Sequence, residues 1–239
     1  MKSLSALALG TACSISLSAI AAVQPASAQL VNGGFETGNF TGWATTGNAS
    51  IQTSAFGSGP TEGTFEALLS TGDPTVPDFS LEVFLGLAPG SLDNLGNGNA
   101  TAGSAIRQTF LAEAGDILTF DWNFLTNEGT PSFFNDFSFV SLAVLSELGD
   151  TTFPIFMNSL TPFNQETGFQ TFSFTIPTTG TYTLGFGATD VADNVVESGL
   201  LVDNVKLTPV PEPTSTLGVL ALGAFGASSL LKRKLQQKA

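Results

Sequence analysis

The chain contains no histidine and a single cysteine, Cys13, and only 11% of its 239 residues are charged. Without these ligands the sequence excludes a His–Cys zinc site and the Ser-His-Asp and Cys-His catalytic systems. Lys and Arg total only 7 against 20 Asp and Glu, a formal net charge of −13. Nucleic acid is excluded as a partner because phosphate binding needs a cationic surface. The length indicates one globular domain with short appendages.

The first 28 residues have the pattern of a secretory signal peptide. Lys2 supplies a positive charge, residues 4–23 are small and apolar, and Ala26-Ser27-Ala28 forms a cleavage site before Gln29. Signal peptidase is therefore an expected partner. Two alternatives are an uncleaved anchor helix and a lipidated Cys13. Cleavage after Ala28 would leave no cysteine, so the exported protein would contain no disulfide.

Residues 210–239 form a second targeting pattern at the other end of the chain. Its parts are the motif Val210-Pro211-Glu212-Pro213, an apolar run predicted as a transmembrane helix over about 214–231, and a basic tail, 232–239. The cluster Lys232-Arg233-Lys234 within that tail favours a cytoplasmic C-terminus, with the body of the protein on the other side of the membrane.

This three-part C-terminus resembles the PEP-CTERM sorting signal of Gram-negative bacteria. The resemblance implies recognition by an exosortase-type membrane protease and cleavage near Pro211-Glu212-Pro213. It also implies an association with exopolysaccharide or biofilm-matrix export. The expected path is export, transient anchoring in the inner membrane by the C-terminal helix, and then release to the cell surface or extracellular matrix.

The region between these two ends, residues 29–209, is strongly acidic. It contains only two cations, Arg107 and Lys206, against nineteen acids, a net charge of −17. Such a surface repels anionic polymers unless cations bridge them. It attracts cations, and Ca²⁺ above all, because carboxylate and carbonyl oxygens are its natural ligands.

Residues 29–209 read as one all-β domain, a single jelly-roll β-sandwich. Short apolar runs alternate with clusters of Gly, Asn, Thr, Pro and Asp, and no stretch has sustained helical periodicity. Residues 73–78 and 92–103 are predicted loops. The predicted strands are 51–53, 65–69, 105–111, 117–124, 136–145, 169–176, 181–188 and 200–207.

The two ends of this domain carry a second resemblance. The opening is Asn32-Gly33-Gly34-Phe35-Glu36 followed by Gly42-Trp43, and the closing strand is residues 201–207. The pair resembles the galactose-binding-like jelly-roll superfamily, which includes many carbohydrate-binding modules. The resemblance implies that Glu36 and Asp203 share a structural Ca²⁺.

Strand alternation gives an independent reason to examine Asp203. It places Leu201, Asp203, Val205 and Leu207 on one face of the closing strand, so the carboxylate should be buried with apolar neighbours. Burying an unpaired carboxylate costs several kcal/mol. A bound cation would offset this cost, and so would hydrogen bonds from backbone N–H groups at a strand bulge. Both explanations for a buried Asp203 stay open.

Other residue patterns are weaker. Trp43 and Trp122 fit the core better than a sugar-stacking platform, and Phe133, Phe134 and Phe137 could either form an exposed patch or cap the sandwich. The Thr-x-Thr spacing within 171–183 fits ordinary strand alternation better than an ice-binding face. Three pairs of acids could in principle serve glycoside hydrolysis: Asp116 with Asp121, Asp190 with Asp193, and Glu197 with Asp203.

Three functions therefore remain. The first is an exported, surface-sorted, non-catalytic protein that is a structural or adhesive component of an exopolysaccharide matrix. The second is a carbohydrate-binding module with specific glycan recognition. The third is a carboxylate-based glycosidase.

Overall fold

The computed structural model describes residues 29–210. The signal peptide with Ala26 and Ala28, the motif residues Pro211-Glu212-Pro213, the predicted helix 214–231 and the basic tail lie outside the described residues. Within 29–210, no helix combines the length and the apolar character needed to cross a bilayer.

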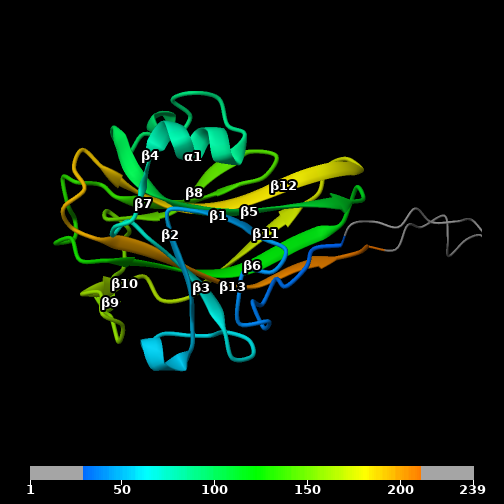
Figure 1. Ribbon diagram of the computed structural model, residues 1–239, viewed down its shortest axis with the longest axis horizontal. Coiled ribbons are helices and arrows are strands. Elements are labelled where there is room, and N and C mark those ends of the chain that lie inside the picture. Colours follow the sequence, from blue (N-terminus) through cyan, green and yellow to red (C-terminus); the bar gives the residue numbers. More distant parts are fainter. Residues whose placement is uncertain (1–28, 211–239) are drawn as a thin grey trace, which may run out of the picture.

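Two antiparallel sheets pack face to face in the described part, an arrangement consistent with the predicted jelly-roll sandwich (Figure 1). The first sheet has the order β1-β5-β12-β7-β8, with β4 also paired to β5. Its strands are β1 (Ala44–Thr46), β4 (Val76–Pro77), β5 (Ala100–Ala112), β7 (Phe137–Ser141), β8 (Leu145–Asp150) and β12 (Gly180–Val191). The second sheet has the order β2-β3-β13-β6-β10-β9, with β11 also paired to β6. Its strands are β2 (Asn48–Gln52), β3 (Glu66–Ser70), β6 (Ile117–Thr126), β9 (Met157–Asn158), β10 (Gln165–Glu166), β11 (Gln170–Thr175) and β13 (Ser198–Thr208).

Phenylalanine side chains fill the space between the sheets. Phe120 of β6 contacts Phe186 of β12 edge to face, with ring centroids 4.7 Å apart, and stacks on Phe172 of β11 at 4.9 Å. Trp43 and Trp122 are buried in this same cluster, which confirms their core assignment. These large aromatic side chains let a chain without disulfides bury a substantial core.

Both sheets are partly covered on their outer faces. The helix α1 (Asp78–Leu85) lies over the first sheet (Figure 1), where Leu81 and Leu85 pack on Phe137 and Phe139. On the second sheet, Phe163 packs on a smaller cluster. The short 3₁₀ helices η1 (Ser54–Phe56) and η2 (Asp93–Leu95) lie in the connections.

The structure corrects several predicted boundaries. The continuous strand expected over 136–145 is two strands, β7 and β8, because the chain turns at residues 142–144. The loop expected over 92–103 ends early, since β5 begins at Ala100. The loop expected over 73–78 contains the short strand β4 and the first residue of α1.

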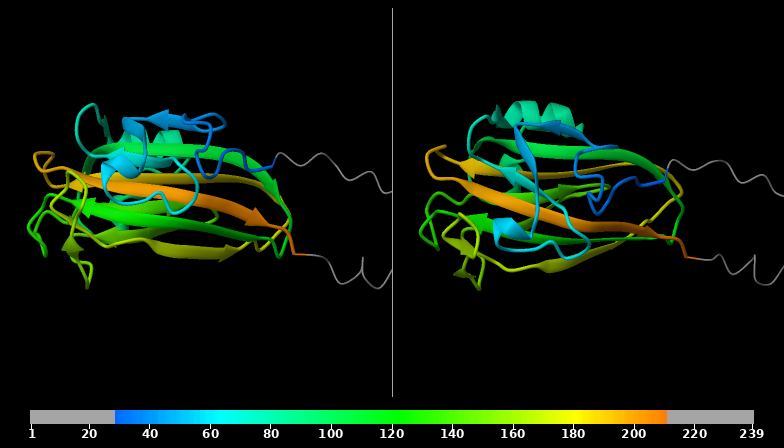
Figure 2. Two further views of the ribbon diagram at one scale, coloured as in Figure 1. Left: turned by 90° about the horizontal axis from the view of Figure 1, so that it is seen from below. Right: turned by 60° about the horizontal axis from the view of Figure 1, so that its bottom comes forward.

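The described segment begins and ends at the same end of the sandwich (Figure 2). Near its start, the Gly33 carbonyl accepts a hydrogen bond from the backbone N–H of Val205 in β13, at 3.0 Å. At its end, the Val210 N–H donates to Asp116 Oδ1 at 3.3 Å. The opening motif and the closing strand therefore lie side by side, as the sequence resemblance implied.

Candidate functional site

Asp203 lies at a bulge in β13. The pairing between β13 and β6 shifts between Asp203 and Lys206, and Asn204 adopts a left-handed conformation with φ of 56°. The bulge turns Val205 and Leu207 toward the main core, whereas Leu201 and Asp203 face the outer side of the second sheet. The prediction that all four share one face is therefore wrong, although Asp203 is fully buried as expected.

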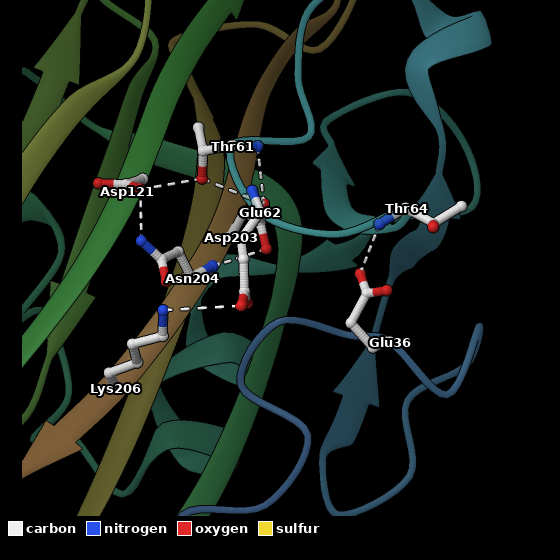
Figure 3. Close-up of polar contacts among 8 residues, drawn as sticks. All are labelled: Glu36, Thr61, Glu62, Thr64, Asp121, Asp203, Asn204 and Lys206. Carbon is white, nitrogen blue, oxygen red and sulfur yellow. Dashed lines mark hydrogen bonds and ion pairs between the residues drawn. The ribbon is translucent and has the colours of Figure 1, made fainter.

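Backbone donors surround the Asp203 carboxylate (Figure 3). Its Oδ2 accepts hydrogen bonds from the backbone N–H groups of Thr61 and Glu62, both at 2.8 Å, and from the Thr61 hydroxyl at 3.1 Å. Its Oδ1 accepts from the Asn204 N–H at 2.6 Å. Burial nevertheless raises the pKa of Asp203, and these hydrogen bonds only partly oppose it.

Glu36 holds the other side of the same loop. Its Oε1 accepts hydrogen bonds from the backbone N–H groups of Thr64 and Phe65, both at 2.9 Å. Figure 3 shows its carboxylate directed at Thr64 and away from Asp203. Two carboxylates therefore fix residues 61–65, which we call the clasped loop.

The predicted calcium site can be compared with this geometry. In the described chain, no three Asp, Glu, His or Cys side chains converge as metal ligands. Glu36 and Asp203 already accept two and four hydrogen bonds, and a carboxylate offers about four lone-pair positions. The two side chains thus act together on one loop, and a Ca²⁺ shared between them stays a prediction.

A polar patch lies beside the clasped loop on the exposed side of the second sheet. We define it as Thr61, Asp121, Thr171, Asn204 and Lys206. Asp121 is its centre: Oδ1 accepts from the Thr171 hydroxyl at 2.6 Å, and Oδ2 accepts from the Thr61 hydroxyl and from Asn204 Nδ2, both at 2.9 Å.

Electrostatics keep the centre of the patch ionised. Partial burial works to raise the pKa of Asp121, but hydrogen bonds from Thr171, Asn204 and Thr61 outweigh it, and the Lys206 charge adds to them, so the pKa lies below its usual value. Lys206 also pairs with Glu62, with Nζ and Oε1 3.7 Å apart. The patch thus combines a carboxylate, an amide, an ammonium group and two hydroxyls.

Glu66 directly follows the clasped loop and is the first residue of β3. It is fully buried, and neither carboxylate oxygen makes a hydrogen bond. Burial raises its pKa to about 8, and the nearby charges of Asp203 and Glu166 push in the same direction. Gly59, with φ of 84°, lies next to this carboxylate, and a Cβ there would meet the Glu66 side chain, so the position favours glycine.

The remaining predicted residues lie apart from this site. Phe133 is 86% exposed whereas Phe137 is buried, so the three phenylalanines neither form one patch nor jointly cap the sandwich. Arg107 is elsewhere, over the Phe84 ring at 4.8 Å and donating to the Phe84 carbonyl. Among the paired acids, the nearby charge of Asp193 contributes to the raised pKa of Asp190.

Sequence reasoning named Asp121 only as a candidate partner of Asp116 in glycoside hydrolysis and missed the patch. Its members come from the clasped loop, β6, β11 and β13, so their proximity depends on strand pairing between distant segments, such as Thr171 opposite Asp121. The Asp-Asn pair at 203–204 was the one local signal, because Asn tolerates the left-handed conformation of a bulge.

Comparison with known proteins gave matches only among solved structures; no family model and no curated protein matches the chain. A carbohydrate-binding module, TmCBM61 in complex with β-1,4-galactotriose, shows 12% identity and a TM-score of 0.45, covering 77% of this chain and 99% of that one. A family 16 carbohydrate-binding module, module-2, shows 16% identity and a TM-score of 0.37, covering 75% of this chain and 98% of that one. The enzymatically active domain of bacteriophage CBA120 tailspike protein 4 shows 12% identity and 0.38, covering 77% and 21%. With scores this low, the fold assignment rests on the strand pairing itself.

Proposed function

We propose that residues 29–209 form a non-catalytic glycan-binding module of an exported protein. This is the alternative of the sequence analysis, and we favour it over a purely structural or adhesive matrix role. The observation that carries it is the polar patch, where the half-buried side chains of Asp121 and Asn204 lie beside the exposed Lys206. Carboxylate, amide and ammonium groups together supply the acceptors and donors that sugar hydroxyls require.

The charge of the module narrows the ligand class. A net charge of −17 disfavours acidic polysaccharides, so we expect neutral glycans to bind best. The clasped loop supports binding by pre-organisation, since four backbone N–H groups are already held by Asp203 and Glu36 and less ordering remains to be done on binding.

Replacing Asp121 with Ala should weaken glycan binding. The carboxylate would be lost as an acceptor, and the Thr61, Thr171 and Asn204 side chains would lose their common partner. Because a hydrogen bond to a charged group contributes about 1.5–3 kcal/mol, affinity should fall at least about tenfold. A panel of neutral oligosaccharides, titrated calorimetrically against the mature protein, measures this.

The matched control is Glu113→Ala, which removes one exposed acid outside the patch. It should bind as the unmodified protein does. Equal losses in both variants would indicate a general charge effect and would contradict a glycan site at Asp121.

We also propose that the protein is sorted through its two ends. The described segment starts and finishes at one end of the sandwich (Figure 2), so a membrane segment after Val210 would place that end near the bilayer. The opposite end, with the β6–β7 and β12–β13 connections, would then face outward. Signal peptidase and an exosortase-type protease are the proposed processing partners.

Mass spectrometry of protein released from the cell surface tests the sorting proposal. The released chain should start at Gln29 and stop between Val210 and Pro213. Deleting Lys232-Arg233-Lys234 should impair its processing, because the basic tail sets the orientation of the predicted helix. A released chain that still contains residues 217–239 would contradict sorting by cleavage.

A further inference from the structure

The β6–β7 and β12–β13 connections lie at the end of the sandwich opposite both ends of the described chain (Figure 1), and a second group of acids belongs to them. We call it the distal cluster and define it as Glu128, Asp136, Asp190 and Asp193. Glu128 lies in the connection from β6 to β7, Asp136 directly precedes β7, and Asp190 is the penultimate residue of β12. Asp193 follows in the connection to β13. Sequence-distant segments thus bring four carboxylates to one end.

Two members of the distal cluster are almost fully buried. Asp190 is 1% exposed, and neither of its oxygens makes a hydrogen bond of normal geometry, although the Thr71 hydroxyl is nearby. Asp136 is also 1% exposed; its Oδ1 accepts from the Val191 N–H at 3.0 Å and its Oδ2 from the Ser198 hydroxyl at 2.7 Å. Oε1 of Glu128 is a third buried oxygen without a partner.

No positive charge compensates these acids. The described chain has two cationic side chains, and both are committed elsewhere, Arg107 at Phe84 and Lys206 at Glu62. An isolated buried carboxylate is costly, so such a group either binds a cation or holds a proton. Burial raises the pKa of Asp136 to about 7 and that of Asp190 to about 8, which shows how strongly this environment disfavours two uncompensated charges.

We propose that Asp136 and Asp190 bind one divalent cation of the calcium type at the distal end. The available ligands are all oxygens, which suits Ca²⁺ and disfavours zinc. Two carboxylates supply the charge. Hydroxyl groups of the adjoining Thr71 and Ser198, backbone carbonyls and water can complete a shell of six to eight ligands, of the kind that Ca²⁺ accepts.

The cation would tie together three connections of the distal end. Thr71 follows β3, Asp136 precedes β7, and Asp190 and Ser198 flank the β12–β13 connection. Ser198 already links two of them, since its N–H donates to the Thr71 hydroxyl at 2.9 Å and its own hydroxyl donates to Asp136. The site is separate from the one predicted at Glu36 and Asp203, and it does not depend on glycan binding.

Calcium binding to the mature protein, freed of metal with a chelator, tests the proposal. Titration calorimetry should show calcium binding, and the melting temperature should rise by roughly 5–11 °C at a hundredfold excess over Kd. Asp190→Asn should lose the binding event at the distal end and the rise in melting temperature that it causes. Without metal, Asp190→Asn should melt above the unmodified protein at neutral pH, because the folded protein must keep the buried acid protonated whereas the unfolded chain releases that proton, and the amide carries no such cost.

Two further variants assign the site. Asp73→Asn changes an exposed acid and should keep the full calcium response. Asp203→Asn alters the other predicted calcium site, so it should keep the calcium binding and the rise in melting temperature that come from the distal cluster. Unchanged calcium binding in Asp190→Asn would overturn the proposal. A melting temperature of the unmodified protein that does not change with calcium would also overturn the proposal. The two buried carboxylates would then be compensated by a shared proton.

Discussion

Replacing Asp203 with Ala is expected to lower the melting temperature by roughly 6–20 °C. The change would strip the backbone N–H groups of Thr61, Glu62 and Asn204 of their acceptor and release one side of the clasped loop. Removing one partner from a buried charged network costs about 3–5 kcal/mol, and each kcal/mol shifts the melting temperature of a domain this size by roughly 2–4 °C. Thermal unfolding followed by circular dichroism measures the change.

The same experiment separates the two explanations for Asp203. If the carboxylate only holds the loop, the loss should be equal in chelator and in millimolar Ca²⁺. If Asp203 and Glu36 also share a cation, part of the difference should disappear in chelator, and Glu36→Gln should lose that same part. Glu113→Ala, with one exposed acid removed, should melt as the unmodified protein does. If the melting temperature of Asp203→Ala lay within one degree of that of the unmodified protein, Asp203 could not be what holds the clasped loop.

The stability of the protein should fall as the pH rises from about 5 to about 8, and Glu66 should be a main cause. Its pKa is raised from the usual 4.5 to about 8 in the folded protein, so the folded state retains a proton that the unfolded chain releases. The stability of the protonated form is fully present below pH 4.5 and is lost as the pH approaches 8.

Glu66→Gln should flatten this pH dependence. The amide keeps the shape of the protonated acid and cannot ionise, so at pH 8 the variant should be more stable by about 4 kcal/mol, or roughly 8–16 °C. Near pH 5 the two proteins should differ little. Chemical denaturation across this pH range tests the prediction. Parallel pH profiles for the two proteins would show that Glu66 is compensated in some other way.

The sequence predicted the sandwich well because Phe-rich alternating segments carry a local signal. Phe120, Trp122 and Phe124 all point into the core, as their spacing in β6 required. The short helix α1 escaped this reasoning because eight residues are too few for a periodic pattern. Its boundary signals were nonetheless present, with Pro77 before it and Gly86 in a left-handed conformation after it.

The candidate site was less predictable than the fold. Strand alternation alone placed Asp203 on the same face as Val205 and Leu207, which is wrong. The bulge inserts one residue, so the side chains after it point to the opposite face of the sheet. Even so, the burial of Asp203 and the possibility of backbone donors at a bulge followed from the sequence. The polar patch and the distal cluster did not, since both join segments that only the strand register brings together.

Glycan binding at the polar patch is tested most directly by nuclear magnetic resonance of the mature protein, titrated with the neutral oligosaccharide that binds best in the panel. The account predicts that the largest amide shifts occur at Thr61, Asp121, Thr171 and Asn204, while the distal end and α1 remain unchanged. Shifts confined to α1 or to the distal end, or no shift with any oligosaccharide of the panel, would contradict it.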